Sequence, residues 1–130
     1  MIVGIGTDLA EVPRIKNSVD RYGDRFLKRV YTDAEIAYAS RKANQAERFA
    51  ARFAAKEAAM KALGTGLRRG VTWKDFEVIN EPSGRPVLHL HGVAQQIAER
   101  MKVRRISLSL THTSELAMAV VIFEDRAEGI

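Results

Sequence analysis

The sequence contains no cysteine among its 130 residues. Disulfide bonds and thiolate chemistry are therefore excluded, and a reducing compartment such as the cytoplasm is the expected location. The first residues, MIVGIGTDL, show no basic segment followed by a long apolar one, so no secretory signal is expected there. No apolar run approaches the roughly 18 residues that a membrane-spanning helix needs, so no membrane association is expected.

Several catalytic motifs are also missing. The glycine pair near the N-terminus lacks the third glycine of a dinucleotide-binding turn, and there is no P-loop. His89 and His91 lie two residues apart, but no third histidine or cysteine stands near them, which excludes a zinc site. Ser107 and Ser109 lie in a predicted strand without the sharp turn that exposes a hydrolase nucleophile.

The composition is that of a folded protein with a positive surface. Hydrophobic residues make up 46% and charged residues 28%, and the length suggests one domain over residues 1–130. The formal net charge is +5. Such a balance favours a polyanionic partner, which could be a nucleic acid, a phosphate-rich cofactor or an acidic protein.

Hydrophobic periodicity predicts a mixture of helices and mostly antiparallel strands, which indicates an α+β domain. Helices are expected from residue 9 to about 22, then over 32–40, 45–63 and 93–102. Strands are expected over 2–8, 75–80 and 86–90, and as a final hairpin over 106–111 and 116–123. The spacing of Thr32 and Glu35 is that of a capping box at a helix start.

An acidic residue, Asp8, follows an apolar strand beside two glycines. Alternation along the strand puts Gly4, Gly6 and Asp8 on one side and the larger residues on the other. Glycine in a strand often marks the close approach of a ligand or of another backbone segment. Asp8 has two interpretations at this point, as a ligand contact or as a cap for the next helix.

Glu57 and Lys61 lie four residues apart in the predicted helix 45–63, so they project from the same face. A simple ion pair along the helix is one interpretation. The surrounding face carries Ala54, Ala58 and Ala62, whose small side chains leave room for a metal–phosphate group. Carboxylates together with substrate phosphates are the usual ligands of Mg²⁺.

His112 continues the apolar side of the strand 106–111 where the final hairpin turns. It is either a structural residue of the turn or a phosphate contact or proton carrier. Arg14, Arg21 and Arg25 recur at spacings of seven and four. They form either a solvated helix face or a basic ridge that docks an acidic partner.

Three stretches together resemble a known family. They are GIGTDLAEVPRI, RFAAKEAAMKALGTGLRRGVTW and SLSLTHTSELAMAVVI, and the resemblance extends over essentially the whole chain. They are similar to the holo-acyl-carrier-protein synthases, the short, single-repeat branch of the 4′-phosphopantetheinyl transferases. The resemblance implies the fold of that family, a mostly antiparallel sheet packed against a long helix.

The resemblance also implies an activity. The family transfers 4′-phosphopantetheine from coenzyme A to a serine hydroxyl of apo-acyl-carrier protein and releases adenosine 3′,5′-bisphosphate. The reaction requires Mg²⁺ and supports fatty-acid biosynthesis. Family members are trimers with active sites between subunits, so a homotrimer is expected here.

Catalytic roles follow from the same resemblance. Asp8 and Glu57 would bind Mg²⁺, Lys61 would contact the transferred phosphate, and His112 would lie with Thr113 against the coenzyme A phosphates. Glu57 is also the expected acceptor of the serine proton. In this hypothesis the glycines beside Asp8 leave space for Mg²⁺ and a pyrophosphate against the strand.

Binding roles are implied for two further sets. The expected coenzyme A contacts are Arg52, Lys61, Gly64, Pro86, His112 and Thr113. The expected docking residues for acyl-carrier protein are Arg14, Arg21, Arg25 and Phe26.

Two other functions compete with this one. A nucleic-acid-binding module fits the basic charge, but the aromatic residues do not interleave with basic residues on a strand, and no recognition helix is evident. A coenzyme A-responsive binding protein without turnover would not need both Asp8 and Glu57. The sequence therefore favours the enzyme.

Overall fold

The computed structural model describes residues 1–41 and 43–126 of the chain. Its elements follow the order β1 (Ile2–Glu11), α1 (Val12–Tyr22), α2 (Asp24–Val30), α3 (Asp33–Ser40), α4 (Gln45–Leu63), the 3₁₀ turn η1 (Trp73–Asp75), β2 (Phe76–Asn80), β3 (Pro86–Leu90), α5 (Gly92–Arg100), β4 (Arg105–His112) and β5 (Leu116–Glu124). The predicted α+β class is confirmed.

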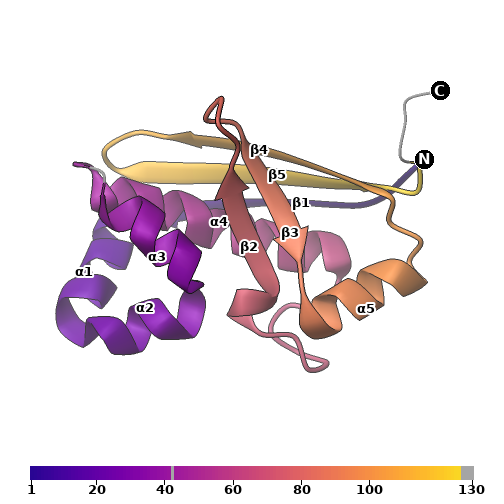
Figure 1. Ribbon diagram of the computed structural model, residues 1–130, viewed down its shortest axis with the longest axis horizontal. Helices are drawn as coiled ribbons and strands as arrows, with labels where there is room; N and C mark the ends of the chain where they lie inside the picture. The colour runs from indigo at the N-terminus through magenta and orange to yellow at the C-terminus, as the bar shows by residue number, and fades with distance from the viewer. Residues whose placement is uncertain (42, 127–130) are drawn as a thin grey trace.

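Two antiparallel sheets lie beside the long helix α4. The larger sheet has the order β1-β5-β4, and β2 and β3 form a separate hairpin. In Figure 1, the three long strands run along α4, while α1, α2 and α3 gather towards one end and α5 lies towards the other. The core forms where α4 packs on one face of the larger sheet, and most of its alanines are fully buried there.

The backbone of α4 lies directly against the glycines of β1. A Cβ added to Gly6 would lie 1.9 Å from the carbonyl oxygen of Ala58, and one added to Gly4 would lie 2.3 Å from that of Ala62. The glycines and alanines therefore let a helix and a strand approach closely. The hypothesis that they leave space for Mg²⁺ and a pyrophosphate is wrong, because α4 itself fills that space.

The first strand is longer than predicted. Residues 9–11 continue β1 because they pair with Met118, Ala117 and Leu116 of β5, so the helix begins at Val12 rather than at residue 9. Pro13 in the first turn of α1 suits that start, since proline there gives up no helical hydrogen bond. The short helix α2, which follows Gly23, was not predicted.

Local signals elsewhere predicted the elements well. The capping box at the start of α3 is present: the hydroxyl of Thr32 accepts from the Glu35 amide at 3.2 Å, and the Thr32 amide donates to Glu35 Oε1 at 2.9 Å. The helix 45–63 is observed with the predicted bounds, and the remaining ends differ by one or two residues.

A buried ion pair that the sequence analysis missed joins α3, α4 and β2. Lys56 Nζ donates to Glu35 Oε1 at 2.8 Å and to the carbonyls of Trp73 and Phe76, and both charged side chains are fully buried. Burial lowers the pKa of Lys56, and the neighbouring Glu35 carboxylate opposes that effect. The pair holds the β2–β3 hairpin at a defined place beside α4.

The other face of the larger sheet carries exposed apolar side chains on β1 and β5, and the described residues do not cover them. Ile5 is 62% exposed and Leu9 is 63% exposed on β1, and Leu116 and Met118 are exposed on β5. The register pairs Leu9 with Met118, so these two side chains are neighbours on this face. β5 is the central strand of this sheet, and only one of its two faces lies in the core.

The described residues include no helix whose length and apolar character would let it cross a bilayer.

Candidate active site

Asp8 and Lys61 meet across β1 and α4. Lys61 Nζ lies 3.1 Å from Asp8 Oδ1 and donates to the carbonyl oxygen of Thr7 at 3.0 Å. Lys61 is therefore held by the strand. Asp8 does not cap α1, because that helix begins after Glu11 and receives no side-chain cap.

Glu57 lies one turn before Lys61 on α4 and faces the same strand. Burial raises the pKa of Glu57, and the nearby negative charge of Asp8 raises it further, while Lys61 acts in the opposite direction. The neighbouring carboxylates of Asp8 and Glu57 repel each other, so a cation bound between them would stabilise both in the charged form.

The donor set is compatible with Mg²⁺. Magnesium is commonly held by one or two carboxylates, with substrate phosphates and water completing the octahedron. Residues 1–41 and 43–126 contain no cluster of three or more histidine, cysteine, aspartate or glutamate side chains arranged for a metal ion. A metal with Asp8 and Glu57 as its protein ligands would thus depend on the substrate for further ligands.

Arg52 lies on a different side of α4 and is only 3% exposed. Its Nη2 donates to Asn80 Oδ1 at 2.6 Å, and its guanidinium lies 4.5 Å from the centre of the Tyr38 ring. Burial lowers the pKa of Arg52, and the charge of Glu35 opposes that shift. Pro86 pairs with Asn80 at the start of β3, so these residues share one end of the β2–β3 hairpin.

His112 and Thr113 lie at the β4–β5 turn. His112 Nδ1 lies 2.9 Å from Glu47 Oε1 in the first turn of α4. The Thr113 hydroxyl accepts from the amides of Glu115 and Leu116, at 3.2 and 3.1 Å, and so shapes the turn. Gly64 is elsewhere, at the C-terminal end of α4, where its φ of 83° ends the helix.

The four predicted catalytic residues, Asp8, Glu57, Lys61 and His112, thus lie in two places within one chain. Glu57 and Lys61 lie in the C-terminal half of α4, and Asp8 contacts Lys61 from β1. Glu47, the partner of His112, lies in the first turn of α4. At 1.5 Å per residue, Glu47 and Lys61 are about 21 Å apart along the helix axis. Within one chain, the Asp8 group and the His112 group therefore lie at opposite ends of α4.

Three of the four predicted docking residues line two adjoining grooves on α1 and α2, and Arg21 lines neither of them. Arg25 and Phe26 line the first, and Phe26 lines the second together with Arg14 and Leu9. Arg14, Arg21 and Arg25 are exposed. The second groove therefore leads from a basic surface to β1, one residue from Asp8.

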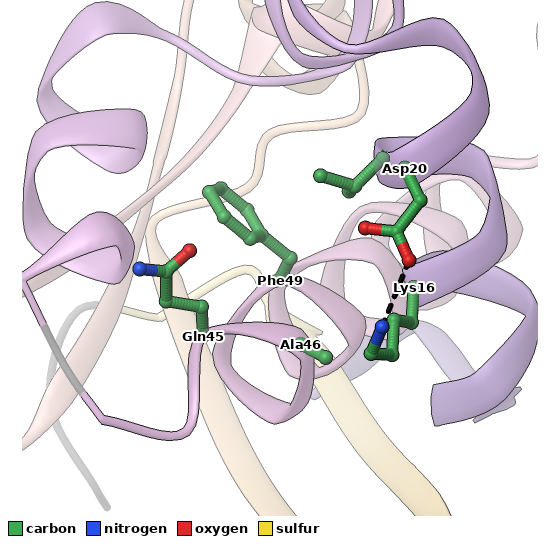
Figure 2. A pocket seen from close by; sticks show the side chains of 6 residues that line it. Lys16, Asp20, Gln45, Ala46 and Phe49 are labelled. Carbon is green, nitrogen blue, oxygen red and sulfur yellow. Dashed lines mark hydrogen bonds and ion pairs between the residues drawn. The ribbon is translucent and has the colours of Figure 1, made fainter.

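A smaller hollow lies between α1 and the start of α4 (Figure 2). The Phe49 ring lies between Gln45 and the pair formed by Lys16 Nζ and Asp20 Oδ2, which are 2.8 Å apart. Of the six residues that line this hollow, none belongs to the predicted site.

Sequence reasoning missed Asn80 and Glu47, the partners of Arg52 and His112. Neither residue stands in a recognisable motif, and each pair is far apart along the chain, with separations of 28 and 65 residues. The pair of Arg52 and Asn80 forms because β2 ends beside α4. The pair of His112 and Glu47 forms because the β4–β5 turn lies against the first turn of α4.

Two carboxylates with a lysine, on an α+β fold beside grooves lined by arginines, suit an enzyme that handles phosphate groups. Comparison with known proteins specifies the class. A family model described as the 4′-phosphopantetheinyl transferase superfamily matches residues 4–121. The chain belongs to this superfamily, as the resemblance predicted.

Its relatives share one description. A holo-[acyl-carrier-protein] synthase of Solibacter usitatus is 63% identical over 125 residues, covering 96% of this chain and 100% of that protein. The crystal structure of a holo-(acyl-carrier-protein) synthase from Bacillus anthracis in complex with CoA (3′,5′-ADP) is 36% identical, covers 97% of this chain and 99% of its own, and has a TM-score of 0.80. The Neisseria meningitidis holo-[acyl-carrier-protein] synthase structure has a TM-score of 0.87 at 31% identity, covering 95% of this chain and 99% of that one.

Proposed function

We propose that this chain is an enzyme that transfers 4′-phosphopantetheine from coenzyme A to a serine hydroxyl of apo-acyl-carrier protein, with Mg²⁺, in the cytoplasm and in support of fatty-acid biosynthesis. The observation that carries the proposal is the cluster of Asp8, Glu57 and Lys61 in a chain 63% identical to a holo-[acyl-carrier-protein] synthase. Residues 1–130 are proposed to act as a single domain.

The reaction is phosphoryl transfer to an alcohol. The serine oxygen bonds to the phosphorus next to the pantetheine arm, the bond from that phosphorus to the bridging oxygen breaks, and adenosine 3′,5′-bisphosphate leaves. Positioning and charge neutralisation provide most of the catalysis in such reactions. Mg²⁺ bound by Asp8 and Glu57 would supply charge neutralisation at the pyrophosphate.

The chain's own residues have complementary roles. Lys61, held by Asp8 Oδ1 and the Thr7 carbonyl, presents its ammonium to the phosphate under attack. Glu57 accepts the serine proton at its carboxylate.

The test of this function is intact-mass analysis of apo-acyl-carrier protein after incubation with the protein, coenzyme A and Mg²⁺. A gain of about 340 Da, the mass of the phosphopantetheine group, that disappears with EDTA supports metal-dependent transfer. No gain with several carrier proteins, while the protein is folded by circular dichroism, contradicts the proposed function.

We further propose a homotrimer with active sites shared between subunits. The apolar outer face of the sheet, with Ile5, Leu9, Leu116 and Met118, is a surface that self-association would bury. A neighbouring copy could also bring its His112 group to the Asp8 group, which one chain keeps apart.

Met118→Glu is expected to dissociate the trimer, because it places a carboxylate in the middle of that apolar face. We expect light scattering to show monomers and transfer activity to fall by about a hundredfold or more if the site needs two subunits. Ala37→Glu, which adds the same charge to an exposed position of α3, is the control and should remain trimeric. A monomeric wild-type enzyme with full activity would contradict the shared site.

Arg14→Glu is expected to weaken docking of the acidic carrier protein. The side chain is exposed, with only a 3.7 Å contact to Glu11, at the groove that leads to β1. Reversing its charge should raise KM for the carrier by about tenfold at low salt, and less at high salt, because the contact is electrostatic. KM for coenzyme A should stay unchanged, and equal effects on both substrates would argue against docking at Arg14. Arg100→Glu, on the exposed side of α5, is the matched control.

A further inference from the structure

Asn80 connects helix α4 with the turn between β2 and β3, two parts of the molecule that are separate in the sequence. Its Oδ1 accepts from Arg52 Nη2 of α4 at 2.6 Å, and its Nδ2 donates to the carbonyl oxygen of Gly84 at 3.0 Å. A side-chain amide offers an acceptor and a donor on two separate atoms, so Asn80 makes both hydrogen bonds at once. A single residue therefore ties the long helix to the turn between β2 and β3.

The turn itself is closely defined. The Glu81 amide donates to the Arg85 carbonyl at 2.8 Å, and the Gly84 amide donates to the Glu81 carbonyl at 2.7 Å. Asn80 also pairs with Pro86 across the hairpin. A shift of Asn80 would consequently move the turn and the start of β3 together.

Arg52 is held by two contacts, but one of its N–H groups has no acceptor among the described residues. Tyr38 packs against its guanidinium on one side and Asn80 binds Nη2, whereas Nε is buried and has no acceptor among residues 1–41 and 43–126. A buried N–H without an acceptor is costly, so the site gains when a ligand supplies one.

We propose that Asn80 is a positioning residue for the nucleotide end of coenzyme A. It orients the Arg52 guanidinium and fixes the β2–β3 turn with Pro86, so that both meet the nucleotide without reorganisation. This inference rests on the proposed function, in which Arg52 and Pro86 contact coenzyme A. Asn80 itself touches protein groups in this structure and acts through them.

Steady-state kinetics of Asn80→Ala test the inference, with coenzyme A and apo-acyl-carrier protein varied in turn. We expect KM for coenzyme A to rise by about tenfold, the usual scale for losing one hydrogen bond to a charged group. KM for the carrier protein and kcat should change by less than about twofold, because the Asp8 cluster is untouched. Gln95→Ala, which removes an exposed amide from α5, is the matched control and should match wild type.

Asn80→Asp separates positioning from stability. The carboxylate keeps the acceptor for Arg52, so the melting temperature should stay close to that of wild type. It cannot donate to the Gly84 carbonyl, and its charge competes with the polyanionic nucleotide for Arg52. KM for coenzyme A should therefore remain raised in a stable protein, which a purely structural role of Asn80 would not produce.

The outcomes are distinct. If the wild-type enzyme modifies no carrier protein, the proposed function fails before Asn80 is considered. If the wild-type enzyme is active and either folded variant keeps KM for coenzyme A within about twofold, or raises both KM values equally, the role of Asn80 is overturned. If Asn80→Ala does not fold, Asn80→Asp decides by the same criterion.

Discussion

Asp8→Ala is expected to reduce phosphopantetheine transfer by about a thousandfold or more, because it removes two functions at once. The substitution deletes one of the two carboxylates proposed to bind Mg²⁺. It also releases Lys61, whose Nζ lies 3.1 Å from Asp8 Oδ1, from the position in which we propose that it faces the phosphate. Mass analysis of the carrier protein over time measures the loss directly.

The same variant should remain folded. The Asp8–Lys61 pair is partly exposed, with side-chain exposures of 17% and 54%, and such pairs contribute at most about 1 kcal/mol to stability. Asp125→Asn is the control, since it removes a carboxylate from another exposed ion pair, that with the N-terminal amine at 2.8 Å. Near-normal turnover of Asp8→Ala at ordinary Mg²⁺ concentrations would reject Asp8 as a metal ligand.

Gly6→Ala is expected to destabilise the protein more than any other single methyl group added to β1. The new Cβ would lie 1.9 Å from the Ala58 carbonyl oxygen and 2.9 Å from the Ala62 amide nitrogen, and both are backbone atoms of α4. No side-chain rotation relieves such contacts, so the helix and the strand must separate. We expect a loss of about 3 kcal/mol or more, and a melting temperature about 10 °C lower or further.

Thr7→Ala provides the matched comparison for Gly6→Ala. Thr7 neighbours Gly6 on β1, but its side chain lies on the face of the sheet opposite α4. Its truncation leaves the contact between helix and strand intact and should shift the melting temperature by no more than about 2 °C. A thermal melt of both variants separates the helix contact from a general sensitivity of β1. Equal melting temperatures for Gly6→Ala and wild type would show that α4 can move away from the strand without cost.

The first strand shows where local patterns stop being informative. Alternation correctly separated the glycines and Asp8 from the larger residues, because strand geometry alone sets that pattern. Whether a ligand or a helix backbone lies against the glycines depends on where α4 packs, and the pattern is the same in both cases. The extension of β1 to Glu11 likewise depends on pairing with β5, which lies more than 100 residues further along the chain.

The sequence by itself determined most of the local elements on which the proposed catalytic residues lie. Glu57 and Lys61 share a helix face because of their spacing, the Thr32 capping box starts α3, and the final hairpin follows from simple alternation. These features depend on residues a few positions apart, whose geometry the backbone dictates.

Only the tertiary structure decided which side chains meet. Lys61 pairs with Asp8 across 53 residues of chain, and Arg52 with Asn80 across 28, because α4 packs between β1 and the β2–β3 hairpin. Among the described residues, the same packing leaves the outer face of the sheet uncovered. It also keeps Glu47, the partner of His112, about 21 Å from Lys61 along the helix axis. Burial and long-range contact are properties of the packed chain as a whole, and no short stretch of sequence specifies them.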